Sequence, residues 1–446
     1  MNADIRSESV LLGRRSLLTA AAGLVCSPVL RGNALSTDAA AGEPVSAAER
    51  AAAQVQHQAQ DEAHWEAVAR FFDRTDGVVN LEHGYWGRMA RPVLEHYTQA
   101  LERVNRDGAW YARRLYGADY QEARARVAAL LGADPEEVAL TRNATEAIHN
   151  LIRQFRWLGR GDAVLVADVD YPSFRRLLEG LGAERGVEVI RLALPPRATQ
   201  DELADLYRSA LARHRHLRLA LVTHVSNQHG LVLPVAAIAD AARAQGVYIL
   251  CDAAQSIGLL DYRVVDLNCD WVGFNLHKWI GSPLGLGALY MRSGTLDAVA
   301  PYPGEHDGDE PSVQRRIHTG TWDFAAAISI PAALDFHLQI GGAQKEARLR
   351  YLRSLWTTPA QDLSGIEVLG GADEASWSGM GSFRLAHATT AEDARALQQR
   401  LLKEFNVFTV PRYGLASGAC VRITPQVFTR ASDVAVLTAA LKELAA

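Results

Sequence analysis

The chain has 446 residues, of which 48% are hydrophobic and 22% charged, and its formal net charge is -5 at pH 7. One hydrophobic core usually serves no more than about 250 to 300 residues, so we expect at least two folded domains. The composition excludes a collagen-like or wholly disordered chain, and without a basic stripe we expect no nucleic-acid partner.

A pair of arginines precedes an apolar run near the start of the chain. Residues 13–18 read Gly-Arg-Arg-Ser-Leu-Leu, residues 16–30 carry no charge, and small residues at 34–36 offer a cleavage site. The run is shorter than the roughly 18 residues of a membrane-spanning helix. We therefore predict a twin-arginine signal peptide at 1–36, export through the twin-arginine machinery to the periplasm or beyond, and no stable membrane anchor. The alternative is a basic tail before a hydrophobic helix.

The remaining elements fall into three segments. Residues 37–90 are expected to form a linker and an N-terminal helical segment. In residues 91–335, strand-like runs alternate with helix-period segments, which predicts an α/β domain with a mostly parallel sheet between helices. The expected strands are 163–167, 187–194, 217–225, 247–252, 271–275 and 287–291, and the expected helices are 173–184, 200–214 and 235–245.

The pattern changes in residues 336–446, where shorter strands accompany helices, and this predicts a smaller C-terminal α+β domain. The expected helices are 343–357, 391–403 and 431–444, and the expected strands are 366–369, 382–385, 407–410 and 420–423.

An aspartate and a lysine accompany two successive predicted strands. Asp252 ends one strand, and Lys278 follows the next strand by three residues. A pyridoxal 5′-phosphate (PLP) site needs an amine for a Schiff base and a carboxylate that keeps the pyridine nitrogen protonated. Alone, a strand-end aspartate is often a loop cap and a lysine is usually a solvated charge. The pair predicts a PLP site only together with the motifs around it.

Five ordered motifs carry a resemblance to a known family. They are Asn-Leu-Glu-His-Gly at 80–84, Thr-Arg-Asn-Ala-Thr-Glu-Ala at 141–147, Ser-Asn-Gln-His-Gly at 226–230, Asp-Ala-Ala-Gln with Asn-Leu-His-Lys-Trp at 252–255 and 275–279, and His-Thr-Gly-Thr-Trp-Asp at 318–323. With them the chain resembles the class V aminotransferases, above all the isopenicillin N epimerase-like branch. The resemblance implies the PLP-dependent transferase fold of type I, with a mostly parallel seven-stranded sheet, and a homodimer with shared active sites.

The resemblance also implies roles for single residues. Lys278 is expected to be catalytic, first as the Schiff-base lysine and then as the acid and base at the α-carbon. Thr321 is expected to reach the cofactor phosphate of the neighbouring subunit. A helix start at Ala144 and Thr145 suits a phosphate, although Thr145 alone is also an ordinary helix cap. The full cofactor-binding set comprises Ala144, Thr145, Tyr171, Asn227, Asp252, Ala254, Gln255, Asn275, His277, Lys278 and Thr321.

At the substrate end, Arg422 is expected to bind a carboxylate, and Arg412 is a second candidate. Tyr85 and Trp86 are expected to line the pocket. Each has an ordinary alternative, because strand-end arginines often form surface ion pairs and aromatic rings often belong to the core.

The positions of the cysteines argue against one class of reaction, sulfur transfer through an enzyme persulfide. Cys251, Cys269 and Cys420 lie in or beside strand-like runs, which favours buried, structural thiols, and no spacing predicts a metal site. The family's desulfurases carry a nucleophilic cysteine on a loop before the arginine strand, and the corresponding loop 413–418 has none.

We therefore expect transamination or epimerisation of an amino acid or a peptide-like molecule of secondary metabolism. By resemblance, exported members of the branch act in siderophore maturation, as for pyoverdine. A PLP-dependent lyase or oxidase and a non-catalytic PLP-fold binding protein remain alternatives. A dinucleotide enzyme is disfavoured because the glycine-rich segment 281–287 follows the lysine instead of the first strand.

Overall fold

The computed structural model describes residues 46–306, 308 and 311–445. The predicted signal peptide at 1–36 and the start of the predicted linker lie outside the described residues, so both stay predictions. The described residues from 48 onward pack as one compact unit. The predicted boundaries at 90 and 335 likewise stay predictions.

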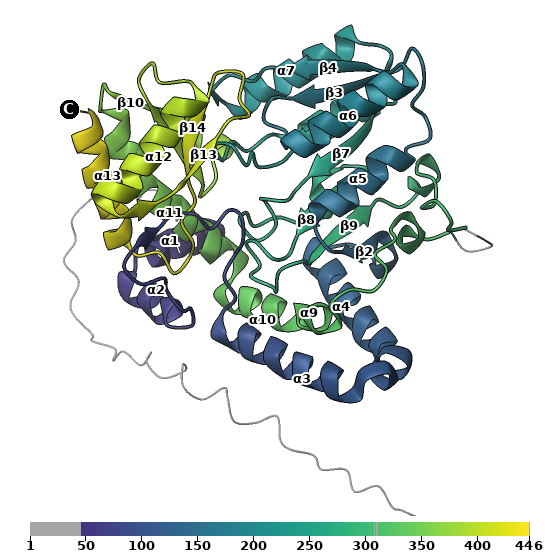
Figure 1. Ribbon diagram of the computed structural model, residues 1–446. Helices are drawn as coiled ribbons and strands as arrows, with labels where there is room; N and C mark the ends of the chain where they lie inside the picture. Colours follow the sequence, from purple (N-terminus) through teal and green to yellow (C-terminus); the bar gives the residue numbers. More distant parts are fainter. Residues whose placement is uncertain (1–45, 307, 309–310, 446) are drawn as a thin grey trace, which may run out of the picture. The chain divides into compact units, whose positions relative to one another are not determined.

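The larger sheet has seven strands in the order β2-β9-β8-β7-β6-β3-β4 (Figure 1). Strand β9 is antiparallel to both neighbours, and the other neighbouring pairs are parallel. The predicted α/β fold with a mostly parallel seven-stranded sheet is therefore confirmed. The strands are β2 (Val138–Thr141), β3 (Ala163–Ala167), β4 (Glu188–Leu192), β6 (Leu217–Thr223), β7 (Tyr248–Asp252), β8 (Trp271–Asn275) and β9 (Gly287–Met291).

Helices cover both faces of this sheet, which is why its central strands are nearly continuous apolar runs. In β3, Val164 and Val166 belong to the hydrophobic cluster that includes Ile148 and Phe174, whereas Leu165 belongs to the cluster on the other face. The helices that pack here are α5 (Ala144–Gln154), α6 (Pro172–Arg185), α7 (Gln200–Arg213) and α8 (Val235–Arg243).

A further group of helices was not expected from the sequence. Figure 1 shows α9 and α10 lying along α3, and the three helices are in contact. Helix α3 is kinked at Gly108, whose φ of 49° lies in the left-handed region. The group comprises α3 (Arg91–Arg114), α4 (Tyr116–Leu131), α9 (Phe324–Ile328) and α10 (Ile330–Ile340), and the chain before it forms α1 (Ala47–Ala59) and α2 (Glu62–Ala69).

A five-stranded sheet in the order β13-β14-β11-β10-β5 takes four strands from the C-terminal part and its edge strand β5 from an earlier segment, so the predicted C-terminal α+β domain is present. Its strands are β5 (Arg197–Ala198), β10 (Ile366–Gly371), β11 (Gly381–Leu385), β13 (Val410–Arg412) and β14 (Cys420–Ile423), and its helices are α11 (Gly342–Gln361), α12 (Ala391–Phe405) and α13 (Ala431–Ala445). The strand predicted at 407–410 is divided, because β12 (Val407–Phe408) pairs with β1 (Val79–Asn80) while β13 pairs with β14.

Single turns of 3₁₀ helix connect several elements, namely η1 (Pro135–Glu137), η2 (Val264–Leu267), η3 (Leu296–Ala298), η4 (Val313–Arg316) and η5 (Glu374–Ser376). Within the described ranges, no single helix is long and apolar enough to cross a membrane. Only the bent pair Phe324–Ile340 and Gly342–Gln361, at 70°, meets that test of length and composition when taken together.

Candidate active site

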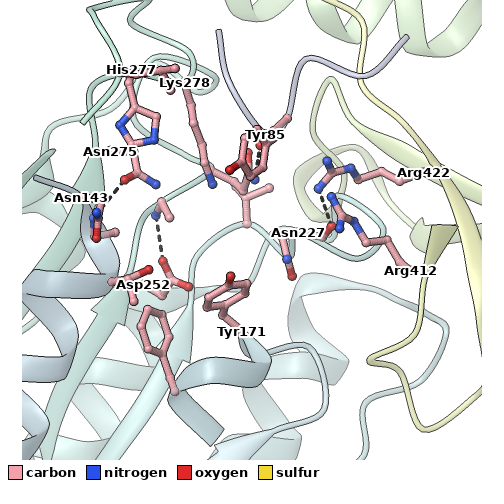
Figure 2. Close-up of a pocket in the computed structure, with 18 of the residues that line it drawn as sticks. Tyr85, Asn143, Tyr171, Asn227, Asp252, Asn275, His277, Lys278, Arg412 and Arg422 are labelled. Atoms are coloured by element: carbon pink, nitrogen blue, oxygen red, sulfur yellow. Dashed lines mark hydrogen bonds between the residues drawn. The ribbon is translucent and has the colours of Figure 1, made fainter. Parts of the chain in front are cut away.

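A cavity of about 450 Å³ opens at the carboxyl ends of the central strands, the edge where open α/β sheets usually bind ligands. Every predicted site residue lines it except Thr321 and Trp86. Figure 2 shows Lys278 reaching into the space between Asp252 on one side and Arg412 and Arg422 on the other. The lining residues that were not predicted are Gly84, Asn143, Phe174, Val225, Leu284 and Gly285.

Lys278 is held in place by a close backbone contact. The Gly87 N–H donates to the His277 carbonyl at 2.9 Å, and a Cβ on Gly87 would lie 1.5 Å from the Lys278 carbonyl oxygen, so only glycine fits there. Burial lowers the pKa of Lys278 to about 8, the Asp252 carboxylate acts against this shift, and Arg422 and Arg412 add to it. A substantial fraction of this amine is therefore neutral and nucleophilic near pH 8.

Asp252 ends β7 at the same edge. Its Oδ1 accepts a hydrogen bond from the Ala254 N–H at 2.9 Å, and its other oxygen makes no hydrogen bond within the described residues. Burial raises the pKa of Asp252 to about 6, against the opposing effects of the Ala254 N–H and of Lys278. The carboxylate is therefore mostly ionised at pH 7, and its free oxygen suits a protonated ring nitrogen.

The start of helix α5 suits a phosphate. Asn143 caps the helix by accepting from the Glu146 N–H at 2.8 Å, and the Ala144 N–H donates to Asn275 Oδ1 at 2.9 Å. Of the first three N–H groups of the helix, those of Ala144 and Glu146 are therefore engaged. The Thr145 N–H is left without a partner among the described residues. It lies where the helix dipole favours an anion.

His277 stands beside this end of the cavity as a neutral ring. Its Nδ1 lies 2.7 Å from the Leu286 carbonyl, which requires a proton on Nδ1 and leaves Nε2 for the cavity. Burial lowers the pKa of His277 to about 4. A phosphate near Nε2 would favour a second proton on this ring.

Tyr171 and Gln255 line the cavity in different ways. The Tyr171 ring precedes helix α6, is 40% exposed, and contacts Phe174 edge-on. The Gln255 amide is engaged at both ends, because Nε2 donates to the Gly84 carbonyl at 2.8 Å and Oε1 accepts from Trp279 Nε1 at 2.9 Å. Gln255 thus joins the segment around Gly84 to the segment around Lys278, and its direct bond to a ligand stays a prediction.

The two arginines differ in their surroundings. Arg422 is fully buried, donates from NH2 to Glu82 Oε1 at 2.6 Å, and donates from NH1 to the Asn227 carbonyl at 2.8 Å. The Arg412 side chain has no hydrogen bond to the described residues, and its nearest carboxylate is Glu82 at 3.9 Å. Sequence reasoning gave Glu82 no role of its own. Its position in the first motif was the available signal, but Arg422 is 340 residues away.

Thr321 and Trp86 lie outside the main cavity. Thr321 is exposed in the segment between η4 and α9, and its predicted contact with a neighbouring subunit stays a prediction. Trp86 lines an adjoining cavity of about 460 Å³ that shares Tyr85 and Arg412 with the first.

The observed groups fit PLP. The cavity has a lysine amine, an ionised carboxylate with a free oxygen, an aromatic ring and a helix start for the phosphate.

Comparison with known proteins supports a PLP-dependent enzyme. The Aminotransferase class-V family matches residues 89–403. Isopenicillin N epimerase of Amycolatopsis lactamdurans is 28% identical over 82% of this chain and 95% of its own. A cysteine desulfurase of Haloferax volcanii is 29% identical over 66% of this chain and 67% of its own.

Solved structures share the fold. The apo structure of a cysteine desulfurase from Thermococcus onnurineus has a TM-score of 0.74 at 21% identity, covering 85% of this chain and 97% of its own. A mutant of C-DES with glycine covalently linked to its PLP cofactor has a TM-score of 0.72 at 22% identity, covering 82% and 96%. The chain therefore belongs to the class V aminotransferase family of PLP-dependent enzymes.

Proposed function

We propose that this enzyme transforms the amino group or the α-carbon of an amino acid or peptide-like molecule, by transamination or epimerisation. The observation that carries the proposal is a single cavity in which Lys278 faces Asp252 on one side and two arginines on the other. When bound, PLP supplies an electron sink that stabilises negative charge at the α-carbon.

The side chains divide the remaining tasks. Lys278 holds the cofactor through its Nζ and, once released, takes a proton from the α-carbon and returns one. Asp252, ionised at neutral pH, keeps a proton on the ring nitrogen. The Thr145 N–H and the start of α5 would bind the phosphate, and a guanidinium at the opposite end of the cavity would bind a carboxylate.

Sulfur transfer through an enzyme persulfide does not fit this site, although the Haloferax relative is a desulfurase. Cys420 is buried in β14, its Sγ lies 3.8 Å from the Gln228 carbonyl, and burial raises its pKa to about 11. Persulfide chemistry needs an accessible thiolate. No cysteine lines the cavity in the described residues.

Elimination is the second candidate. It needs the same proton transfer by Lys278 and a leaving group on the β-carbon, and it needs no cysteine. C-DES, described as a cystine C–S lyase, shares this fold. The two candidates differ in their products, because elimination releases ammonia and the leaving group, whereas epimerisation returns the amino acid.

The decisive experiment begins with the visible spectrum of the purified protein loaded with PLP. The wild type and Lys403→Ala, which removes an exposed lysine on α12, are expected to be yellow, and Lys278→Ala is expected to lose that colour. Incubation with amino acids and peptides in D₂O then separates the reactions: a ketone without ammonia reports transamination, α-proton exchange without a ketone reports epimerisation, and release of ammonia reports elimination. A wild type that is colourless after incubation with excess PLP and removal of the unbound cofactor would refute the proposal.

We further propose export by the twin-arginine route. The support is the sequence of residues 13–30 alone. Replacing Arg14 and Arg15 by lysine is expected to leave the protein in the cytoplasm, as measured by cell fractionation. Equal export of both forms would contradict the prediction. Action on a secreted siderophore is a proposal that depends on this export.

A further inference from the structure

An internal carboxylate already occupies the arginine that sequence reasoning favoured for the substrate. Glu82 is only 8% exposed, and its Oε1 lies 2.6 Å from Arg422 NH2, while its Oε2 lies 3.3 Å from the Thr424 hydroxyl. Burial alone would raise the pKa of Glu82, but Arg422 and Arg412 lower it below the ordinary value, so Glu82 is ionised at neutral pH. The charge of Arg422 is thus already balanced by a carboxylate of the protein itself.

The rest of the Arg422 guanidinium is engaged or shielded from the cavity, and only its buried Nε has no partner among the described residues. Its NH1 donates to the Asn227 carbonyl, its side chain has no exposed surface, and a Cβ on Gly84 would lie 2.8 Å from its NH2. A substrate carboxylate reaches this guanidinium only if it displaces Glu82. Displacement would leave a buried carboxylate without its main partner, which is costly.

Arg412 is the guanidinium that remains available. It pairs with Cys420 across the β13–β14 ladder, and Val410 pairs with Arg422, so both arginines lie on one face of the sheet as diagonal neighbours. The Arg412 side chain is 24% exposed and borders both cavities. Figure 2 shows it beside Asn227, next to the space that Lys278 enters. Both arginines have a buried Nε without a partner among the described residues, so exposure and the distance to Glu82, 3.9 Å for Arg412 and 2.6 Å for Arg422, distinguish them.

The charges of this cluster are unequal. Two arginines face one glutamate, which leaves one positive charge, and one carboxylate would balance it. We propose that Arg412, not Arg422, binds the substrate carboxylate, and that Glu82 is an internal counter-charge that fixes Arg422. The inference rests on the proposed chemistry on amino acids and assigns the carboxylate-binding residue of the same site. Arg422 is then a positioning residue that orders Glu82 and Asn227.

Binding of matched probes tests this assignment. L-Norleucine and n-pentylamine have the same carbon chain and differ only in the carboxylate, and both are titrated into the PLP-loaded protein while the visible spectrum is followed. We expect the wild type to bind norleucine about 10- to 100-fold more tightly, the usual effect of a charged hydrogen-bonded pair. Arg412→Gln should remove this preference without changing the affinity for pentylamine, and Arg412→Lys should keep part of it.

A charge control separates contact from long-range attraction. Arg395 is exposed on α12 and lies over the Tyr413 ring at 5.2 Å, outside the cavity lining. Arg395→Gln should keep the wild-type preference for norleucine. If Arg412→Gln keeps it too, or if the wild type shows none, the assignment is overturned.

The double variant Glu82→Gln/Arg412→Gln tests the role of Glu82. Without the internal carboxylate, Arg422 should become available, and part of the preference for norleucine should return. A folded double variant, verified by circular dichroism, that regains none would overturn the role given to Glu82.

Hexanoate distinguishes failure of this inference from failure of the proposed function, because it carries the carboxylate and no amine. Calorimetric binding of hexanoate that is lost in Arg412→Gln supports the assignment even if no amine changes the spectrum, a result that would refute only the amino-acid chemistry. Equal hexanoate binding by the wild type and Arg412→Gln overturns the assignment.

Discussion

Because Glu82 and Arg422 form a buried ion pair, we predict that removing Arg422 lowers the stability of the protein, and that the size of the loss depends on pH. Replacing Arg422 by methionine leaves the Glu82 carboxylate buried with Arg412 at 3.9 Å and the Thr424 hydroxyl at 3.3 Å. Breaking a buried ion pair from one side costs about 3–5 kcal/mol. With about 2.1 cal/mol/K of unfolding entropy per residue over about 400 residues, that cost lowers the melting temperature by about 4–6 °C.

The assay is thermal unfolding followed by circular dichroism at several pH values. The pKa of Glu82 is lowered in the folded state, so the pair stabilises the protein above the ordinary value of 4.5, and the effect is lost as pH falls through the folded pKa. The difference between wild type and Arg422→Met should therefore shrink in acid. Glu82→Met/Arg422→Met should regain most of the loss, since an apolar pair replaces both charges. A double variant as unstable as the sum of the single ones would refute this reasoning.

Three further predictions concern other parts of the site. Reloading of cofactor-free protein with PLP should accelerate as pH rises through about 8, because the pKa of Lys278 is lowered and the neutral amine reacts. The rate is measured by stopped-flow absorbance within about 1 pH unit on either side of that value, and a rate that does not change with pH would contradict the prediction. Gly87→Ala should cost at least the usual overpacking energy of about 1–3 kcal/mol and so lower the melting temperature by about 1–4 °C or more, whereas Gly117→Ala, where a Cβ meets no atom within 4 Å, should not lower it. If the enzyme is a homodimer with shared sites, Thr321→Val should weaken PLP retention in dialysis by about 10-fold, as loss of one hydrogen bond to a charged group implies, and unchanged retention would argue against that contact.

The sequence predicted six of the seven strands of the central sheet, because most of them are short apolar runs between turn residues, and it did not predict β2 (Val138–Thr141). Strands β3, β8 and β9 begin and end where expected, at 163–167, 271–275 and 287–291. Tertiary pairing decided what the sequence did not show. The run at 407–410 divides because Val407 pairs with Val79, more than 300 residues earlier in the chain, while Val410 pairs with Arg422.

In the site, too, local sequence patterns predicted positions, whereas contacts between distant segments could not be predicted. Local motifs predicted which residues gather in the cavity, since Asp252 ends a strand, Lys278 follows a strand and Thr145 lies at the start of a helix. They did not predict hydrogen-bond partners. The Ala144 N–H is engaged by Asn275, which is 131 residues away, so a backbone amide expected to face the phosphate is already used.

The properties of Lys278 show why chemistry is harder to predict than position. Its pKa depends first on burial and then on four charged groups, and three of them, Glu82, Arg412 and Arg422, come from segments far away in the chain. A motif places the lysine after β8, but the balance between these charges exists only in the folded chain. A carboxylate bound at Arg412 would change that balance and raise the pKa of Lys278. Substrate binding would then itself adjust the group that moves the proton.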